Sequence, residues 1–164
     1  MKKILAVTAL VSLIALSVCA EGYVNANDLE KGTLTSESVL EDGFKILSTA
    51  EKPVVIDAPG DPLPKNADGE QFNLRINLKG KGNTEYRCVS FPAKAGETIT
   101  VDCATSSKTD TRTLVVVDAE GNNVLSIAAA PGNVARGKAK APKDGTYYAF
   151  SSGSGMYIYQ IDVK

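Results

Sequence analysis

The strict alternation of apolar and polar residues is the feature that most constrains how this chain can fold. The clearest case is the segment FNLRINLK, residues 72–79. A period of two places alternate side chains on opposite faces of an extended strand, with one apolar face and one hydrogen-bonding face. Its apolar positions are Phe72, Leu74, Ile76 and Leu78, and its polar positions are Asn73, Arg75, Asn77 and Lys79. Because the period of 3.6 that is typical of helices is nearly missing after residue 20, the sequence predicts an all-β domain.

Further extended segments follow at short and nearly regular intervals. They are predicted at residues 44–48, 53–57, 86–92, 97–103, 112–118, 123–128, 135–141, 146–151 and 156–163, with Gly, Pro, Asn and Asp turn residues between them. We expect 86–92 and 97–103 to form a hairpin. Residues 21–40, with a brief helical turn in 25–32, and the proline-rich loop 58–65 should be the least ordered stretches. Many short strands predict an antiparallel sandwich or barrel.

Four stretches that together cover nearly all of residues 27–163 carry a family resemblance. They are residues 27–57, 67–93, 105–126 and 144–163. With its strands in this order, the chain resembles a jelly-roll β-sandwich module found in secreted bacterial pectate lyases and related polysaccharide-degrading proteins. A looser likeness, in residues 91–101, 114–125 and 141–150, is to the bacterial pre-peptidase C-terminal domain. The resemblance implies an antiparallel jelly-roll-like fold and a noncatalytic, carbohydrate-associated role, and it supplies no ligand residues. The cysteines depart from that pattern, and no catalytic domain accompanies the module.

The first twenty residues predict export. Lys2 and Lys3 precede an uncharged apolar run over residues 4–18, which closes on Val-Cys-Ala. Such a run is shorter than a membrane-spanning helix requires and is typical of a cleavable signal peptide, so we expect cleavage after Ala20 and a secreted or periplasmic protein without a membrane span. Lipidation of Cys19 is the alternative. Residues 21–164 then form a single domain.

The charge balance bears on the choice of partner. The net charge of −1 becomes −3 once the two signal-peptide lysines are removed. An acidic domain of this kind argues against a nucleic-acid partner.

The two cysteines outside the signal segment, Cys88 and Cys103, predict a disulfide. Exported proteins meet an oxidising environment, and the bond would close a loop of about 15 residues, which contributes about 3 kcal/mol in the chain-entropy model. The alternative is a pair of buried free thiols.

The chain contains no histidine, which removes the common nucleophile-base systems and histidine metal sites. Carboxylate catalysis would need a defined pair, and no spacing among the Asp and Glu residues singles one out. We therefore predict that the protein is not an enzyme and needs no catalytic cofactor. The oxygen-rich segment 57–70 could hold a structural calcium ion, although plain turns are favoured. Its candidate ligands are Asp57, Asp61, Asp68 and Glu70.

A ligand-binding face is predicted on the polar side of residues 72–79. Arginine guanidinium groups and amide side chains form hydrogen bonds with sugar hydroxyls, and arginine also pairs with uronate carboxylates. The alternative is an ordinary solvent-facing sheet surface, which shows the same alternation. By parity with Ile161 and Val163, Tyr157 and Tyr159 are expected in the core. The ligand set also takes in Arg87 on a neighbouring strand, Arg112 beside a Ser/Thr-rich loop, and Tyr147, expected to be exposed while Tyr148 is buried. The full predicted set is Asn73, Arg75, Asn77, Lys79, Arg87, Arg112 and Tyr147.

These features predict an exported carbohydrate-binding module for plant cell-wall or acidic polysaccharide. The alternative is a structural or interaction protein of the cell surface or periplasm that assembles through its sheet edges. Residues 135–141 alternate Arg136, Lys138 and Lys140 with small residues, which is typical of an edge strand protected by lysines. The sequence leaves the oligomeric state open.

Overall fold

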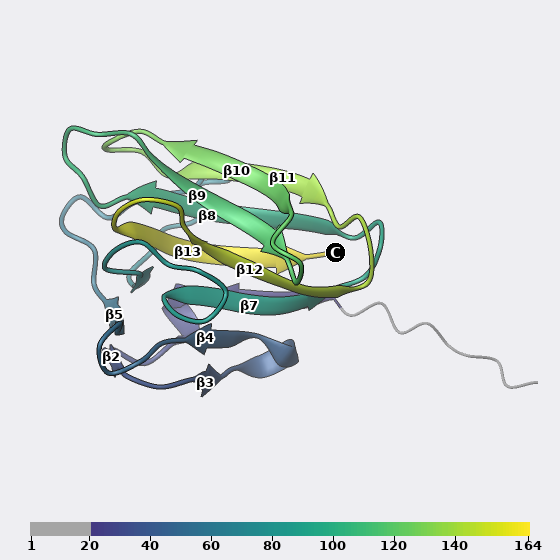
Figure 1. Cartoon of the computed structure of the whole chain (residues 1–164). Helices are drawn as coiled ribbons and strands as arrows, with labels where there is room; N and C mark the ends of the chain where they lie inside the picture. The colour runs from purple at the N-terminus through teal and green to yellow at the C-terminus, as the bar shows by residue number, and fades with distance from the viewer. Residues whose placement is uncertain (1–20) are drawn as a thin grey trace, which may run out of the picture.

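The computed structural model describes residues 21–164, so the predicted signal peptide and Cys19 lie outside the described residues. Two antiparallel sheets pack face to face as a jelly-roll-like β-sandwich (Figure 1). Sheet A has the order β11-β8-β13-β6-β5-β2, with β1 also paired to β13, and sheet B has the order β10-β9-β12-β7-β4-β3. Sheet A contains β1 (Gly22–Asn25), β2 (Gly32–Leu34), β5 (Val54–Asp57), β6 (Arg75–Asn77), β8 (Thr98–Thr105), β11 (Ala135–Lys140) and β13 (Met156–Val163). Sheet B contains β3 (Ser38–Val39), β4 (Lys45–Leu47), β7 (Cys88–Ala93), β9 (Arg112–Asp118), β10 (Asn123–Ala129) and β12 (Gly145–Ser151).

The predicted all-β fold class is confirmed, and each predicted strand is present, two of them (112–118 and 156–163) with the predicted ends and the others with shifted ends. The strand predicted at 72–79 is much shorter, because only Arg75–Asn77 pair with neighbours. The expectation for residues 21–40 was wrong. They form β1, β2 and β3, with the expected helical turn as the 3₁₀ helix η1 (Ala26–Asp28), and a second 3₁₀ helix, η2 (Glu41–Gly43), follows. β1 is ordered because it pairs with β13 and turns Val24 into the core.

The predicted hairpin of 86–92 with 97–103 was also wrong. β7 lies in sheet B between β4 and β12, whereas β8 lies in sheet A between β11 and β13. Consecutive strands therefore cross from one sheet to the other, and the same holds for β12 and β13. Both strands of each pair are apolar toward the sandwich interior, so a sequence pattern cannot tell whether two such strands pair or face each other.

The core between the sheets is built by the inward positions of both. Phe44, Phe91 and Tyr147 form a row of stacked rings, with centroids 5.4 Å apart for Phe44–Phe91 and 6.2 Å apart for Phe91–Tyr147. Tyr147 is fully buried, and its hydroxyl donates to the carbonyl oxygen of Lys143 at 2.6 Å. The expectation that Tyr147 is exposed and binds ligand was therefore wrong. Its register explains the error: Tyr147 lies directly opposite Phe91 on β7 and shares its inward face, which turns the half-buried Tyr148 outward.

The predicted disulfide is wrong as well, because Cys88 and Cys103 are both free and buried. Val89 and Phe91 point into the core, so the alternation along β7 sends the Cys88 side chain to the outer face of sheet B, opposite Leu47 and Phe150. Cys103 points inward from sheet A. One side chain thus lies inside the sandwich and the other outside it, and two such cysteines cannot be bridged without moving the backbone.

Both thiols should resist alkylation while the protein is folded. Burial raises the pKa of Cys88 and of Cys103 to about 12, and Asp102 adds to the effect at Cys103, so neither forms the reactive thiolate near neutral pH. Titration of mature, unreduced protein should find no rapidly reacting thiol in buffer and two in denaturant. A result of no thiols in denaturant would instead establish the disulfide.

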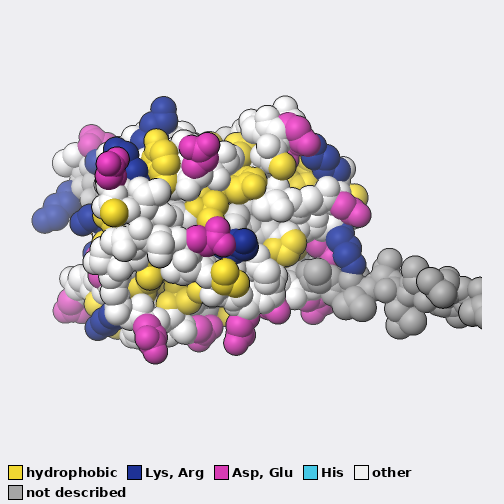
Figure 2. Space-filling view, turned by 60° about the horizontal axis from the view of Figure 1, so that its bottom comes forward, with side chains coloured by type: hydrophobic (Ala, Val, Ile, Leu, Met, Phe, Trp, Pro, Cys, Tyr) yellow, Lys and Arg dark blue, Asp and Glu magenta, His cyan; other side chains and the backbone are white. Residues whose placement is uncertain are grey.

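The sheet edges are short or covered. β11 is the edge of sheet A, which confirms the edge-strand prediction, and it packs near β10, the edge of sheet B. Gly137 permits this approach, since a Cβ there would stand 2.4 Å from Cγ1 of Ile127. At the opposite edge β2 and β3 are only three and two residues long. Figure 2 shows that end with hydrophobic side chains interspersed among charged and white ones. No helix among residues 21–164 has the length and apolar character needed to cross a membrane.

Candidate functional site

The outer face of sheet A carries a long loop, residues 58–74, that leaves β5 and returns to β6. The loop is fixed by a small apolar cluster in which Phe72 stacks on Tyr159, with ring centroids 4.8 Å apart, next to Ala104. Burial raises the pKa of Tyr159 to about 12, so its hydroxyl stays protonated. The loop therefore has a buried attachment of its own, separate from the main core.

The strand β13 places Tyr157 and Tyr159 differently from the prediction that both lie in the core. Tyr157 is half-buried on the outer face, and Tyr159 is buried beneath the loop. A β-bulge between Ile158 and Gln160 causes this change. The bulge adds one residue and reverses the parity, so Ile158 and Ile161 both point inward while the two tyrosines belong to the loop-covered side.

Charged and amide groups hold the far end of the loop over β8 and β11. Arg136 binds Asp102 with two hydrogen bonds of 2.7 Å and also reaches Asp68 of the loop at 2.5 Å. Asn66 donates to Asp102 at 3.2 Å and to Glu70 at 3.1 Å. The hydrogen bonds from Asp102 and Asp68 raise the pKa of Arg136 above its usual range, and Arg136 lowers the pKa of Asp68. These contacts latch the loop to the sheet.

The predicted calcium ligands form separate contacts with other side chains. Asp57 pairs with Arg75, Asp68 pairs with Arg136, and Glu70 accepts from the amides of Asn25 and Asn66. Within the described part of the chain, no three His, Cys, Asp or Glu side chains are grouped so that they could hold a metal ion. Asp57, Asp61, Asp68 and Glu70 therefore do not form one cage in this structure, because two of the four carboxylates pair with arginines and a third accepts from amides.

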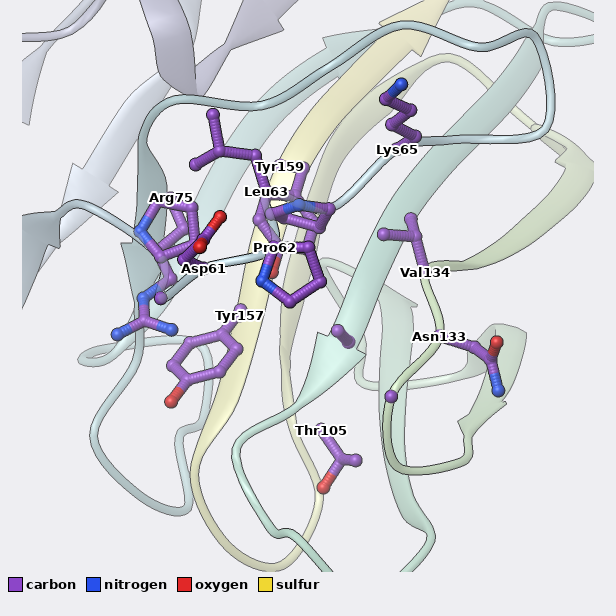
Figure 3. A pocket seen from close by; sticks show the side chains of 15 residues that line it. Asp61, Pro62, Leu63, Lys65, Arg75, Thr105, Asn133, Val134, Tyr157 and Tyr159 are labelled. Carbon is purple, nitrogen blue, oxygen red and sulfur yellow. The ribbon is translucent and has the colours of Figure 1, made fainter.

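A first pocket of about 580 Å³ opens between the proline-rich part of the loop, the turn at 132–134, Arg75 and Tyr157 (Figure 3). The Arg75 guanidinium lies 3.9 Å from the centroid of the Tyr157 ring and covers one side of it. Asp57 fixes that position, because it accepts from Arg75 Nε at 2.5 Å and from Asn77 Nδ2 at 3.0 Å. One face of Tyr157 is thus occupied, and its remaining surface is available to a ligand.

A second, smaller pocket of about 260 Å³ is lined by the same tyrosine and by Asn77. Its remaining wall combines two cations with small polar groups. These lining residues are Lys79, Ser106, Arg112, Ser154 and Gly155. Tyr157 is therefore a wall of both pockets, so the two cavities are adjacent, and the second is completed by turn residues and by Arg112 at the start of β9.

Four of the seven predicted ligand residues come together here: Arg75 in the first pocket and Asn77, Lys79 and Arg112 in the second. The other three do not line these pockets. Asn73 lies in the loop, where its backbone N–H donates to Asn27 Oδ1 at 2.7 Å. Arg87 packs on Gly80, where a Cβ would stand 2.6 Å from its Nη1. Tyr147 is in the core.

Sequence reasoning missed Tyr157 and the contribution of the loop. Parity counted back from Ile161 and Val163 placed Tyr157 inside, and it overlooked that Met156 and Ile158 have the other parity, which is the mark that the bulge leaves in the sequence. The Ser/Gly-rich turn at 151–155 offered a weak signal, because small residues let a neighbouring side chain approach the backbone, as Arg112 does at Gly155.

Comparison with known proteins supports the fold. The family description "Bacterial pre-peptidase C-terminal domain" matches residues 85–149, which is less than half of the chain and runs from just before β7 into β12. No curated protein matches the sequence significantly.

Solved structures share the sandwich at low sequence identity. The CBM22-1 xylan-binding domain of Xyn10C from Paenibacillus barcinonensis aligns with a TM-score of 0.51 and 11% identity over 87% of this chain and 91% of that one. CBM35 of Abf62 from Cellvibrio japonicus aligns with a TM-score of 0.45 and 14% identity over 87% and 93% of the two chains. At these identities the likeness to the xylan-binding domain shows the β-sandwich fold alone.

Proposed function

We propose that the protein is an exported, noncatalytic carbohydrate-binding module whose ligand lies across the outer face of sheet A, with a preference for plant cell-wall or acidic polysaccharide. The observation that carries the proposal is the position of Tyr157 as the common wall of two neighbouring pockets. An aromatic surface beside fixed hydrogen-bonding groups suits a sugar, which has apolar ring faces and polar edges.

The polar groups around Tyr157 are already held in place before any ligand arrives. Asp57 orients both Arg75 and Asn77, and the loop is latched at its far end by Arg136. A preformed site loses little conformational entropy on binding, so modest contacts can give useful affinity. The xylan-binding domain with the same fold supports a sugar as the ligand class.

Replacing Tyr157 with alanine should weaken glycan binding by about tenfold or more, because the change removes the wall shared by both pockets. The test is isothermal titration of mature protein with soluble xylan, polygalacturonate and cellulose oligomers. The change also removes the stacking partner of Arg75, so folding of the variant is checked by circular dichroism.

Tyr148→Ala is the matched control. Tyr148 is another half-buried tyrosine, but it lies on the outer face of sheet B, beside Lys45, Ser90 and Pro92. This variant should bind glycans like the wild type. Loss of binding in Tyr148→Ala with retention in Tyr157→Ala would move the site to the opposite sheet, and a wild-type protein that binds no glycan would refute the proposal.

A further inference from the structure

The two pockets beside Tyr157 differ in charge. The first is balanced, since Asp57 neutralises Arg75 and the loop contributes both Asp61 and Lys65 to its lining. The second is lined by Lys79 and Arg112 and by no carboxylate. Among residues 21–164, neither of these two cations has a carboxylate within ion-pair distance. The second pocket is thus a cationic cavity without an internal counterion.

Arg112 is held in the second pocket by one edge of its guanidinium. Its Nη1 donates to Ser106 Oγ at 2.7 Å and to the Gly155 carbonyl oxygen at 2.9 Å. Gly155 makes room for this arrangement, since a Cβ there would stand 2.6 Å from Ser106 Oγ and 3.6 Å from Arg112 Nη1. Within the described residues, Nε and Nη2 of Arg112 have no hydrogen-bond partner. The guanidinium of Arg112 is therefore fixed at one edge and keeps N–H donors at the other, where a planar anion can bind.

Lys79 lines the same pocket as the Arg112 guanidinium, and its own backbone conformation is uncommon. Its φ is +62°, and its N–H donates to Asn77 Oδ1 at 3.1 Å, which stabilises the bend at the end of β6. A positive φ is disfavoured for lysine, so the surrounding structure must maintain it. Asn77 is in turn fixed by Asp57, and both cations line the second pocket together with Tyr157.

We propose that this second pocket is a subsite for the carboxylate of an acidic sugar residue, bound by Lys79 and Arg112. The ring of that residue contacts Tyr157, and a neighbouring sugar without a charge occupies the first pocket. The inference rests on the proposed glycan-binding function and adds the charge of the ligand, the pocket that receives it and the two residues that recognise it. A sulfate ester presents a similar anion, so the experiment separates the two.

The experiment titrates mature protein with oligogalacturonate, with the same oligomer after reduction of its carboxyl groups, with a sulfated galactan oligomer, and with neutral xylo-oligosaccharide. Wild type should bind oligogalacturonate about ten- to a hundredfold more tightly than the reduced oligomer, as charge-assisted hydrogen bonds predict, and added salt should narrow this ratio. Lys79→Gln and Arg112→Gln should each bring the ratio close to one while leaving affinity for the reduced oligomer nearly unchanged.

Lys31→Gln is the charge-matched control, since Lys31 is exposed and lines neither pocket, and this variant should keep the wild-type ratio. Lys79 is also exposed, so Lys79→Gln gives a folded variant even if Arg112→Gln loosens the Ser106 contact. Unchanged ratios in both site variants, or tighter binding of the sulfated oligomer, would overturn the carboxylate subsite. If the carboxylate subsite fails in this way but xylo-oligosaccharide still binds through Tyr157, the proposed glycan-binding function is retained without it. If no glycan binds, both proposals fail.

Discussion

Arg136→Met is expected to lower the free energy of unfolding by about 3–5 kcal/mol, because it leaves Asp102 as a buried carboxylate without its partner. The Asp102 side chain is 1% exposed, and Arg136 satisfies both of its oxygens. The remaining contact, from Asn66 at 3.2 Å, carries no charge. Urea unfolding followed by circular dichroism measures the loss.

Asp68→Asn is the matched control on the other side of the same guanidinium. Asp68 also pairs with Arg136, but its side chain is 72% exposed, so water compensates for the lost contact. The loss of stability should be a small fraction of that in Arg136→Met. Because the pKa of Asp68 is lowered in the folded protein, its contribution is complete above its ordinary pKa and disappears as the pH falls through the folded value. Equal losses in the two variants would show that the buried pair is not the main contribution.

The strand pattern could be predicted from the sequence because each strand has one buried face. Alternation at 135–141 reflects this directly, and this segment and 112–118 are both strands close to the predicted ends. Which strands pair is a different question. β7 and β8 carry compatible apolar faces, and whether they lie in one sheet or face each other depends on all their neighbours rather than on the two segments.

The cysteine error could have been avoided with the sequence alone. Once Val89 and Phe91 are placed inward on one strand and Val101 on the other, Cys88 must point outward and Cys103 inward. The general tendency of exported proteins to form disulfides outweighed this local geometry. The short sequence separation of the two cysteines was misleading, because the intervening residues carry the chain from sheet B to sheet A.

The candidate site was predictable in part. The polar face of β6 correctly placed Arg75 and Asn77 on the outer side of a sheet, because alternation is a local property. It could not place Tyr157, since the bulge that turns this side chain outward depends on the pairing of β13 with β8. It also could not show that Asp57 binds Arg75 beside the first pocket, because this ion pair is a long-range contact.

A second large effect on stability is expected at Tyr147, and a much smaller one at the adjacent Tyr148 of β12. Tyr147→Ala should lower the free energy of unfolding by about 3–5 kcal/mol, as for other large buried aromatic residues, because the ring fills the core beside Phe91 and its hydroxyl binds the Lys143 carbonyl oxygen. Tyr148→Ala should cost less than half as much, since that side chain is half-buried on the outer face. Urea unfolding of the two variants and the wild type measures both losses.

The milder variant Tyr147→Phe separates a role in the core from a role in binding. It keeps the ring between the sheets and removes only a hydroxyl, so it should reduce stability by about 1 kcal/mol and leave glycan affinity unchanged. Tyr157→Ala should show the opposite pattern, with a large loss of affinity and a smaller loss of stability, because Tyr157 lines both pockets outside the main core. A tenfold loss of glycan affinity in Tyr147→Phe would mean that the tyrosine of the core, and not the one beside the loop, determines the binding site.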